Sequence, residues 1–272
     1  MEKIPLPDYE AVPLDDIAEH VRGIRILFVN VFAITTDSGG WTLVDAGLPL
    51  SAERIERWAH DVGGAPQNIV LTHGHFDHVG SLAELAERWN VPVYAHELEL
   101  PYITGDSQYP KPDPRVGGGV MALISALYPR GPVDVRPRAV ALPADGSVPG
   151  LPGWRWIHTP GHTAGHVSLF RDSDGMLLAG DAFCTTRQES LLAVALQRAE
   201  LHGPPAYYTT DWDAARASVE RLAALDPLVV AAGLGLPMSG PGTSDALREL
   251  AARFDEVARP AQGRYVDHPV RA

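Results

Sequence analysis

Three histidines and an aspartate fall within six positions of the chain, in the segment LTHGHFDHVG (residues 71–80). The segment overlaps the end of an apolar run, NIVLT, and precedes a stretch in which apolar residues recur at helical spacing. Polar side chains of this kind are costly to crowd together unless something binds them. The cluster therefore predicts a strand, a functional loop and a helix in succession, the arrangement that places ligands at strand ends in α/β folds.

The rest of the chain alternates in the same way. β-Branched and apolar segments predict strands in residues 24–36 (one long strand or two), 41–47, 68–72, 91–96, 154–162, 166–170, 176–181 and 227–233. Apolar residues at helical spacing predict helices in residues 51–63, 79–89, 209–225 and 244–258. The third helix is expected to begin with a capping box from Thr210 to Asp213. This order favours two mixed β-sheets flanked by helices over one doubly wound sheet.

No segment of disordered composition divides the chain, so residues 1–272 are expected to form a single α/β (α+β) domain. Two irregular stretches are expected as insertion loops beside the site, at about residues 105–132 and 184–210, with one short helix in the first. A substrate would enter between them. Their tyrosines would either line a pocket or pack the loops: Tyr102, Tyr109, Tyr128, Tyr207 and Tyr208.

Composition excludes several classes of partner. Hydrophobic residues make up 45% of the 272 residues, enough for a sizeable core. The net charge of −12 argues against a nucleic-acid partner, which clustered Lys and Arg would attract. No basic and apolar leader opens the sequence, and no apolar run approaches the ~18 residues of a membrane span. With one cysteine, Cys184, no intramolecular disulfide can form, which favours a cytoplasmic location; the oligomeric state is not indicated.

Other strand ends carry the same residue types. The segments HTPGHTAGH (158–166), LLAGDAF (177–183) and TLVDAG (42–47) each place a His or Asp beside a glycine where a strand should end. Residues i and i+2 of an extended segment point the same way, so His73 and His75 can chelate one ion together. A hydrolytic zinc needs about three protein ligands and one open position, so further ligands are expected from these segments.

The ordered motifs HGHFDH, a later GH and a later GD resemble those of the metallo-β-lactamase superfamily, from about Ile24 to the final helix. The resemblance implies a four-layer αβ/βα sandwich of two mixed sheets flanked by helices. It also implies two adjacent metal centres. The ligands implied for the first are His73, His75 and His162. Asp181 would bridge the two ions, and Asp77 and His78 would face the second. Asp45 would orient the loop by hydrogen bonds without binding metal.

One motif of the family is missing. Where the resemblance implies a histidine between two glycines, this chain reads AAGLGLPMSG, so the ligand position is occupied by Leu234, which has no lone pair. Cys184 or His202 could substitute. The expectation is one tightly held Zn²⁺ and a second site that is weak or empty, with iron or manganese as alternative metals.

The expected reaction is attack by metal-bound hydroxide on the ester, lactone, thioester or amide carbonyl of a small-molecule substrate. Asp77 would either hold the water and carry its proton to the leaving group, or remain a plain ligand. Two alternatives stay open. One is a mononuclear iron oxidoreductase resembling persulfide dioxygenases, with His73 or His75, His162 and Asp181 as a 2-His-1-carboxylate set. The other is a catalytically impaired descendant that only binds a ligand.

Overall fold

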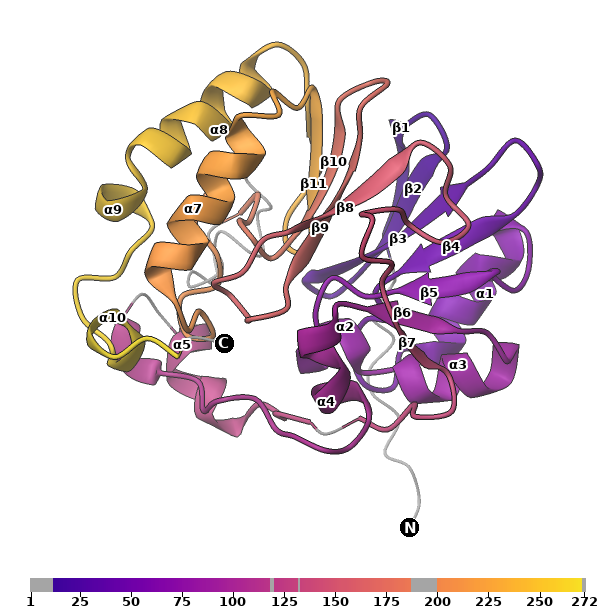
Figure 1. Cartoon of the computed structure of the whole chain (residues 1–272), viewed down its shortest axis with the longest axis horizontal. Coiled ribbons are helices and arrows are strands. Elements are labelled where there is room, and N and C mark those ends of the chain that lie inside the picture. Colours follow the sequence, from indigo (N-terminus) through magenta and orange to yellow (C-terminus); the bar gives the residue numbers. More distant parts are fainter. Residues whose placement is uncertain (1–11, 118–119, 132, 187–199, 271–272) are drawn as a thin grey trace.

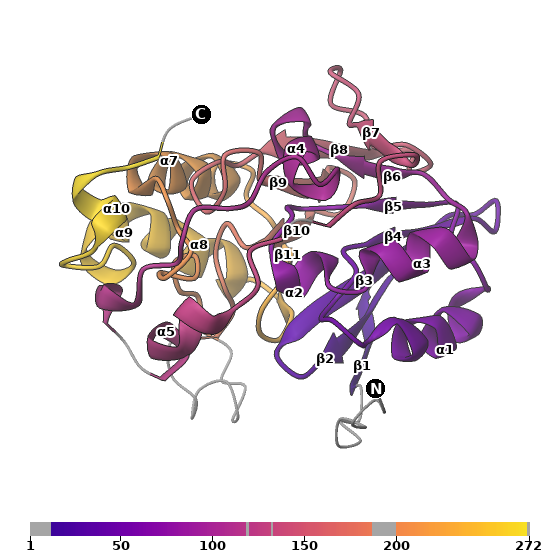
Figure 2. The same ribbon diagram turned by 90° about the horizontal axis from the view of Figure 1, so that it is seen from below.

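The computed structural model describes residues 12–117, 120–131, 133–186 and 200–270. Two mixed β-sheets pack face to face, and helices cover their outer faces (Figures 1 and 2). The predicted αβ/βα sandwich is therefore confirmed. Among the described residues, no helix is both long and apolar enough to cross a lipid bilayer.

The first sheet has seven strands in the order β1-β2-β3-β4-β5-β6-β7. The strands are β1 (Val12–Ala18), β2 (Val21–Ile26), β3 (Val29–Thr35), β4 (Trp41–Val44), β5 (Asn68–Val70), β6 (Val93–Ala95) and β7 (Ala139–Ala141). Pairing is antiparallel up to β4 and parallel from β4 to β7. The helices α1 (Ala52–Val62) and α3 (Leu82–Trp89) cover its outer face, burying Ile55, Leu82 and Leu85 completely.

The second sheet has five strands in the order β12-β11-β10-β9-β8. The strands are β8 (Trp154–His158), β9 (Val167–Arg171), β10 (Met176–Gly180), β11 (Val229–Ala232) and β12 (Met238–Ser239). The helices α7 (Trp212–Ala223) and α8 (Gly242–Ala252) cover its outer face. Apolar side chains of both sheets, including Phe32, Val70, Leu169 and Leu178, form the core between the two sheets.

Short helical elements connect these layers. They are α2 (Phe76–Val79), η1 (Glu97–Glu99), α4 (Leu100–Ile103), η2 (Pro114–Val116), α5 (Val120–Ile124), η3 (Ser125–Leu127), α9 (Phe254–Val257) and α10 (Arg264–Asp267). The stretch 105–132 thus contains α5 where one short helix was expected, together with two 3-10 turns. Of the second predicted insertion, residues 187–199 lie outside the described residues.

Two local expectations were wrong. The cap of α7 is Asp211, whose carboxylate accepts from the backbone N–H groups of Asp213 and Ala214, so the capping box from Thr210 does not form. The segment 24–36, for which one long strand or two was expected, is two strands, because Leu27 adopts a left-handed turn conformation with φ +60°. The helix expected from residue 79 is preceded by α2, so Asp77 and His78 lie on a short helix and not in a loop.

Candidate metal centre

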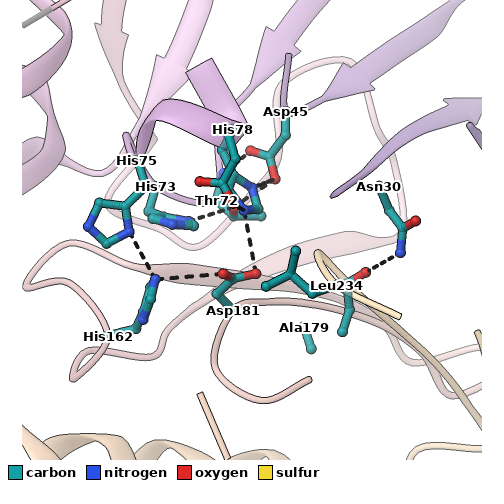
Figure 3. A network of polar contacts seen from close by, with 12 residues as sticks. Asn30, Asp45, Thr72, His73, His75, His78, His162, Ala179, Asp181 and Leu234 are labelled. Atoms are coloured by element: carbon teal, nitrogen blue, oxygen red, sulfur yellow. Dashed lines mark hydrogen bonds and ion pairs between the residues drawn. The ribbon is translucent and has the colours of Figure 1, made fainter. Parts of the chain in front are cut away.

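The ends of five strands meet at one edge of the sandwich, and the polar motifs follow them. Asp45 comes directly after β4, His73 lies three residues after β5, and His162 lies four residues after β8. Asp181 and Gly233 come directly after β10 and β11. Backbone hydrogen bonds tie these ends together, for example from Asp45 N to Val70 O at 2.9 Å. The fold therefore brings side chains far apart in sequence to one place (Figure 3).

The three histidines predicted for a first centre lie together. One nitrogen of each of His73, His75 and His162 falls within 4.8 Å of the others, as ligands of one ion require. His75 Nδ1 and His162 Nε2 are 2.9 Å apart. All three side chains are buried. Burial is also the main reason that the pKa of each imidazole lies well below its usual value, so each is neutral and offers a lone pair.

A second group consists of His73, His78 and Asp181, again with ligand atoms within 4.8 Å of one another. The two oxygens of Asp181 point to different groups (Figure 3). Oδ1 lies 3.4 Å from His78 Nε2 in its own group, and Oδ2 lies 3.6 Å from His162 Nε2 in the first group. His73 faces both groups, whereas the resemblance placed it in the first alone. Asp77 stands further out: its Oδ2 is 3.9 Å from His78 Nε2, and Asp77 belongs to neither group.

Among the described residues, three buried atoms of this centre form no hydrogen bond: His73 Nε2, His78 Nε2 and Asp181 Oδ1, of which the last two form only the ion pair at 3.4 Å. Buried polar atoms are almost always paired, because an unpaired one loses its hydration without compensation. These three point into the same small space, and imidazole nitrogen with carboxylate oxygen is the donor set that a divalent transition metal prefers. The residues present therefore fit a metal ion.

Asp45 fixes the tautomers of two of these histidines. Its Oδ2 accepts from Thr72 Oγ1 at 2.8 Å and lies 2.8 Å from His78 Nδ1, while Oδ1 accepts from Thr72 N at 2.8 Å. A carboxylate oxygen can only accept, so the Thr72 hydroxyl donates its proton to Asp45. His73 Nδ1, which lies 3.1 Å from Thr72 Oγ1, must therefore donate to that hydroxyl oxygen. In both His73 and His78, Nδ1 is thus engaged and Nε2 is left facing the centre.

Two residues that the sequence analysis did not single out also hold the centre. His166 Nε2 accepts from the backbone N–H of Asp181 at 2.9 Å, and its Nδ1 lies 2.8 Å from Thr159 Oγ1. Burial lowers the pKa of His166 to about 3, which keeps the accepting nitrogen unprotonated. Asn30 Nδ2 donates to the carbonyls of Ala232 and Gly235. The second GH of HTPGHTAGH was a signal for His166, whereas Asn30 lies inside a strand and carried none.

Leu234 follows the strand end where the missing ligand was expected. Its side chain is 2% exposed, packs in the hydrophobic cluster of the seven-stranded sheet, and extends toward the Asp181 carboxylate in Figure 3. The preceding backbone lies against the centre, because a Cβ on Gly233 would be 2.3 Å from Asp181 Oδ1. In the part of the chain that the structure describes, neither Cys184 nor His202 belongs to a group of candidate ligands.

Aromatic rings cover the outer side of His75. The Tyr208 ring stacks on it with centroids 4.4 Å apart, and the Tyr109 ring lies at 4.5 Å. Tyr102 stacks on Tyr109 at 3.9 Å, so it packs the loop. The Tyr208 hydroxyl is buried and has no hydrogen-bond partner in the described part of the chain.

Fold and site together define a two-sheet sandwich with a histidine-rich candidate metal centre at its strand ends. The sequence model of the metallo-beta-lactamase superfamily matches residues 24–233, more than half of the chain, and the chain belongs to this superfamily. The match ends at Gly233, immediately before Leu234.

Individual relatives agree with this assignment. The probable metallo-hydrolase YflN of Bacillus subtilis (strain 168) is 44% identical over 247 residues, covering 89% of this chain and 94% of the relative. A hydroxyacylglutathione hydrolase of Halorhodospira halophila (strain DSM 244 / SL1) is 30% identical over 155 residues, which cover 56% of this chain and 46% of the relative. The protein TTHA1623, solved in a di-iron-bound form, matches with a TM-score of 0.55 and 26% identity over 80% of this chain and 92% of that one.

Proposed function

We propose that the protein is a metal-dependent hydrolase that cleaves the ester, lactone, thioester or amide bond of a small-molecule substrate. The convergence of His73, His75 and His162, with their nitrogens within 4.8 Å of one another, carries the proposal. The relatives support the general class, because one is named a probable metallo-hydrolase and another hydrolyses a thioester by its name. The −12 charge supports a substrate other than nucleic acid, and the single cysteine supports a cytoplasmic location.

When bound, a divalent ion would supply a water of lowered pKa and would polarise the carbonyl under attack. His73, His75 and His162 would hold it, with Asp181 reaching toward the position of a second ion. Zinc is the proposed metal, because neutral imidazoles dominate the donor set. We further propose that Leu234 leaves the group of His73, His78 and Asp181 one ligand short, so that the protein holds one ion tightly.

Asp77 and Tyr208 are the groups proposed to act on the substrate. Asp77 is the most exposed of the candidate ligands at 7%, and it stands outside both ligand groups. Its carboxylate can therefore orient the attacking water and carry a proton to the leaving group. The Tyr208 hydroxyl can donate a hydrogen bond to a substrate oxygen above His75.

Iron-dependent oxidation is the second candidate. The observation that favours it is the group of His73, His78 and Asp181, which differs from the set with His162 expected from the sequence. Two histidines and one carboxylate suit iron, and TTHA1623 was solved in a di-iron-bound form.

The test uses protein purified without chelators. Elemental analysis identifies the metal, and hydrolysis is measured on p-nitrophenyl acetate, γ-butyrolactone and an acyl thioester before chelation, after it and after metal is restored. Hydrolysis that is lost and regained with zinc supports the proposal. Iron with oxygen uptake would support the second candidate, and a bound metal without any turnover would favour a ligand-binding protein.

A further inference from the structure

Glu99 is a completely buried carboxylate that the metal chemistry above does not use. Asp45, Asp77 and Asp181, also buried, belong to the candidate centre, and buried Asp113 binds Arg115 and the backbone of Arg264. Glu99 ends the 3-10 helix η1, which follows strand β6 of the seven-stranded sheet. It therefore reaches the centre from a strand end that contributes no candidate ligand.

The two carboxylate oxygens serve two different loops. Oε2 accepts from Gly74 N, between His73 and His75, at 3.0 Å, and it also accepts from the Tyr109 hydroxyl. Oε1 accepts from Thr163 Oγ1 at 2.7 Å and from Gly165 N at 2.9 Å. Each carboxylate oxygen thus accepts two hydrogen bonds, which uses both of its lone pairs. Oε2 serves the loop of His73 and His75, and Oε1 serves the loop of His162. We call Glu99 and these four donors the Glu99 clamp.

The sequence at both loops is shaped to let this carboxylate approach. A Cβ on Gly165 would lie 2.8 Å from Glu99 Oε1, and a Cβ on Gly74 would lie 2.7 Å from the Tyr109 hydroxyl. Real side chains do not come so close, so both positions require glycine. The glycine of AGH therefore leaves room for the Glu99 carboxylate, and the glycine of HGH leaves room for the Tyr109 hydroxyl that donates to it.

The two clamped loops belong to different sheets. Gly74 follows β5 of the seven-stranded sheet, whereas Thr163 and Gly165 lie between β8 and β9 of the five-stranded sheet. A backbone bond from Val167 N to Thr72 O also joins the sheets, but both of its ends lie outside the clamped segments. The Glu99 clamp instead holds residues next to the ligands, because Gly74 lies between His73 and His75 and Thr163 follows His162.

We infer that Glu99 is a positioning residue for the first metal centre: by holding Gly74 and Thr163 to one carboxylate, it sets the gap between His75 and His162. That gap is 2.9 Å between the facing nitrogens. The inference rests on the proposed metal dependence, and it assigns to Glu99 the separation of ligands that come from two sheets. Groups that orient metal ligands without touching the ion typically change metal affinity about 10- to 100-fold when removed.

The test compares Glu99→Gln with Glu97→Gln, a change in the same 3-10 helix at an exposed position. Glutamine keeps the size of Glu99 but turns an N–H₂ group toward two of the four donors. Zinc affinity is measured with Zn²⁺ alone against a chromophoric chelator, and thermal unfolding is measured on the metal-free proteins. Glu99→Gln should bind zinc about 10- to 100-fold more weakly, while Glu97→Gln should match the unaltered protein.

A purely structural role would lower the unfolding temperature of metal-free Glu99→Gln and leave the zinc affinity of the folded fraction unchanged, which would overturn the inference. If Glu99→Gln does not fold, Thr163→Val removes one donor to Oε1 and should still weaken zinc binding several-fold; an unchanged affinity would again overturn it. If the unaltered protein binds zinc normally but hydrolyses nothing, the proposed function is contradicted, whereas the inference that Glu99 positions the ligands still stands.

Discussion

Replacing Leu234 by histidine tests whether one missing ligand explains an incomplete second centre. The Leu234 side chain extends toward the Asp181 carboxylate (Figure 3), and Gly233 beside it lies against both Asp181 and His78. An imidazole starting from this backbone would face Asp181 Oδ1 and His78 Nε2, which form no hydrogen bond among the described residues. Its bulk is similar to that of leucine, so no cavity opens.

The cost of Leu234→His follows from burial. Full burial of a leucine side chain is worth about 1.5–3 kcal/mol, which the variant gives up in part. A hydrogen bond from the new imidazole to charged Asp181 returns about 1.5–3 kcal/mol. The metal-free variant should therefore lose at most about 2 kcal/mol, a fall in Tm of roughly 4–8 °C for a domain of this size.

Metal should reverse that loss. After identical dialysis against zinc, the unaltered protein should hold close to one equivalent and Leu234→His close to two. A second ion at about 100 times its Kd adds about 2.7 kcal/mol, so zinc should raise the Tm of the variant more than that of the unaltered protein. Leu234→Met, which conserves volume, is the matched control and should stay at one equivalent. Two full equivalents in the unaltered protein would refute the reasoning, as would a folded histidine variant that still holds one.

Three further changes probe the other parts of the centre. His162→Ala should lose both tight zinc and hydrolysis, whereas His268→Ala, at an exposed position, should keep both; full metal and activity in the first would contradict the ligand set. Asp45→Asn keeps a residue that tolerates the positive φ of +63°, but it leaves one acceptor oxygen for the three donors of Thr72 and His78, so zinc affinity should fall about 10- to 100-fold, and chelator competition would show it. Tyr208→Phe should lower kcat/KM about three- to tenfold with zinc content unchanged, the effect of one neutral hydrogen bond; no change would remove Tyr208 from the mechanism.

Much of the framework was predictable because the periodic segments are long and strongly patterned. The apolar spacing of Leu82, Leu85 and Ala86 predicted α3, and their side chains are buried in that helix. Strand β1 was missed because VPLDDIA carries two acidic residues and a proline, and its pairing with β2 depends on the fold around it. The cap of α7 was misplaced by one residue, because Asp211 and Thr210 are both good caps and only the backbone geometry decides between them.

The candidate ligands were found because each follows a strand beside a glycine, which is a local signal. Some of the residues that hold those ligands, among them Asn30 and Glu99, have no such signal. Glu99 lies 25 positions from Gly74 and 66 positions from Gly165, and nothing in HELEL indicates that its carboxylate is buried between them. Tyr109 was expected either to line a pocket or to pack its Pro-rich loop, and only the structure shows that it is buried against His75. Contacts of this range depend on how the two sheets meet, which a single sequence does not specify.

The most direct test of the account is a titration of metal-stripped protein with zinc while ester or lactone hydrolysis is followed. If His73, His75 and His162 hold the ion that matters, activity should rise linearly and level off near one equivalent per chain. A plateau only at two equivalents, or hydrolysis that survives complete removal of metal, would contradict the claim that a single ion at these histidines drives the reaction.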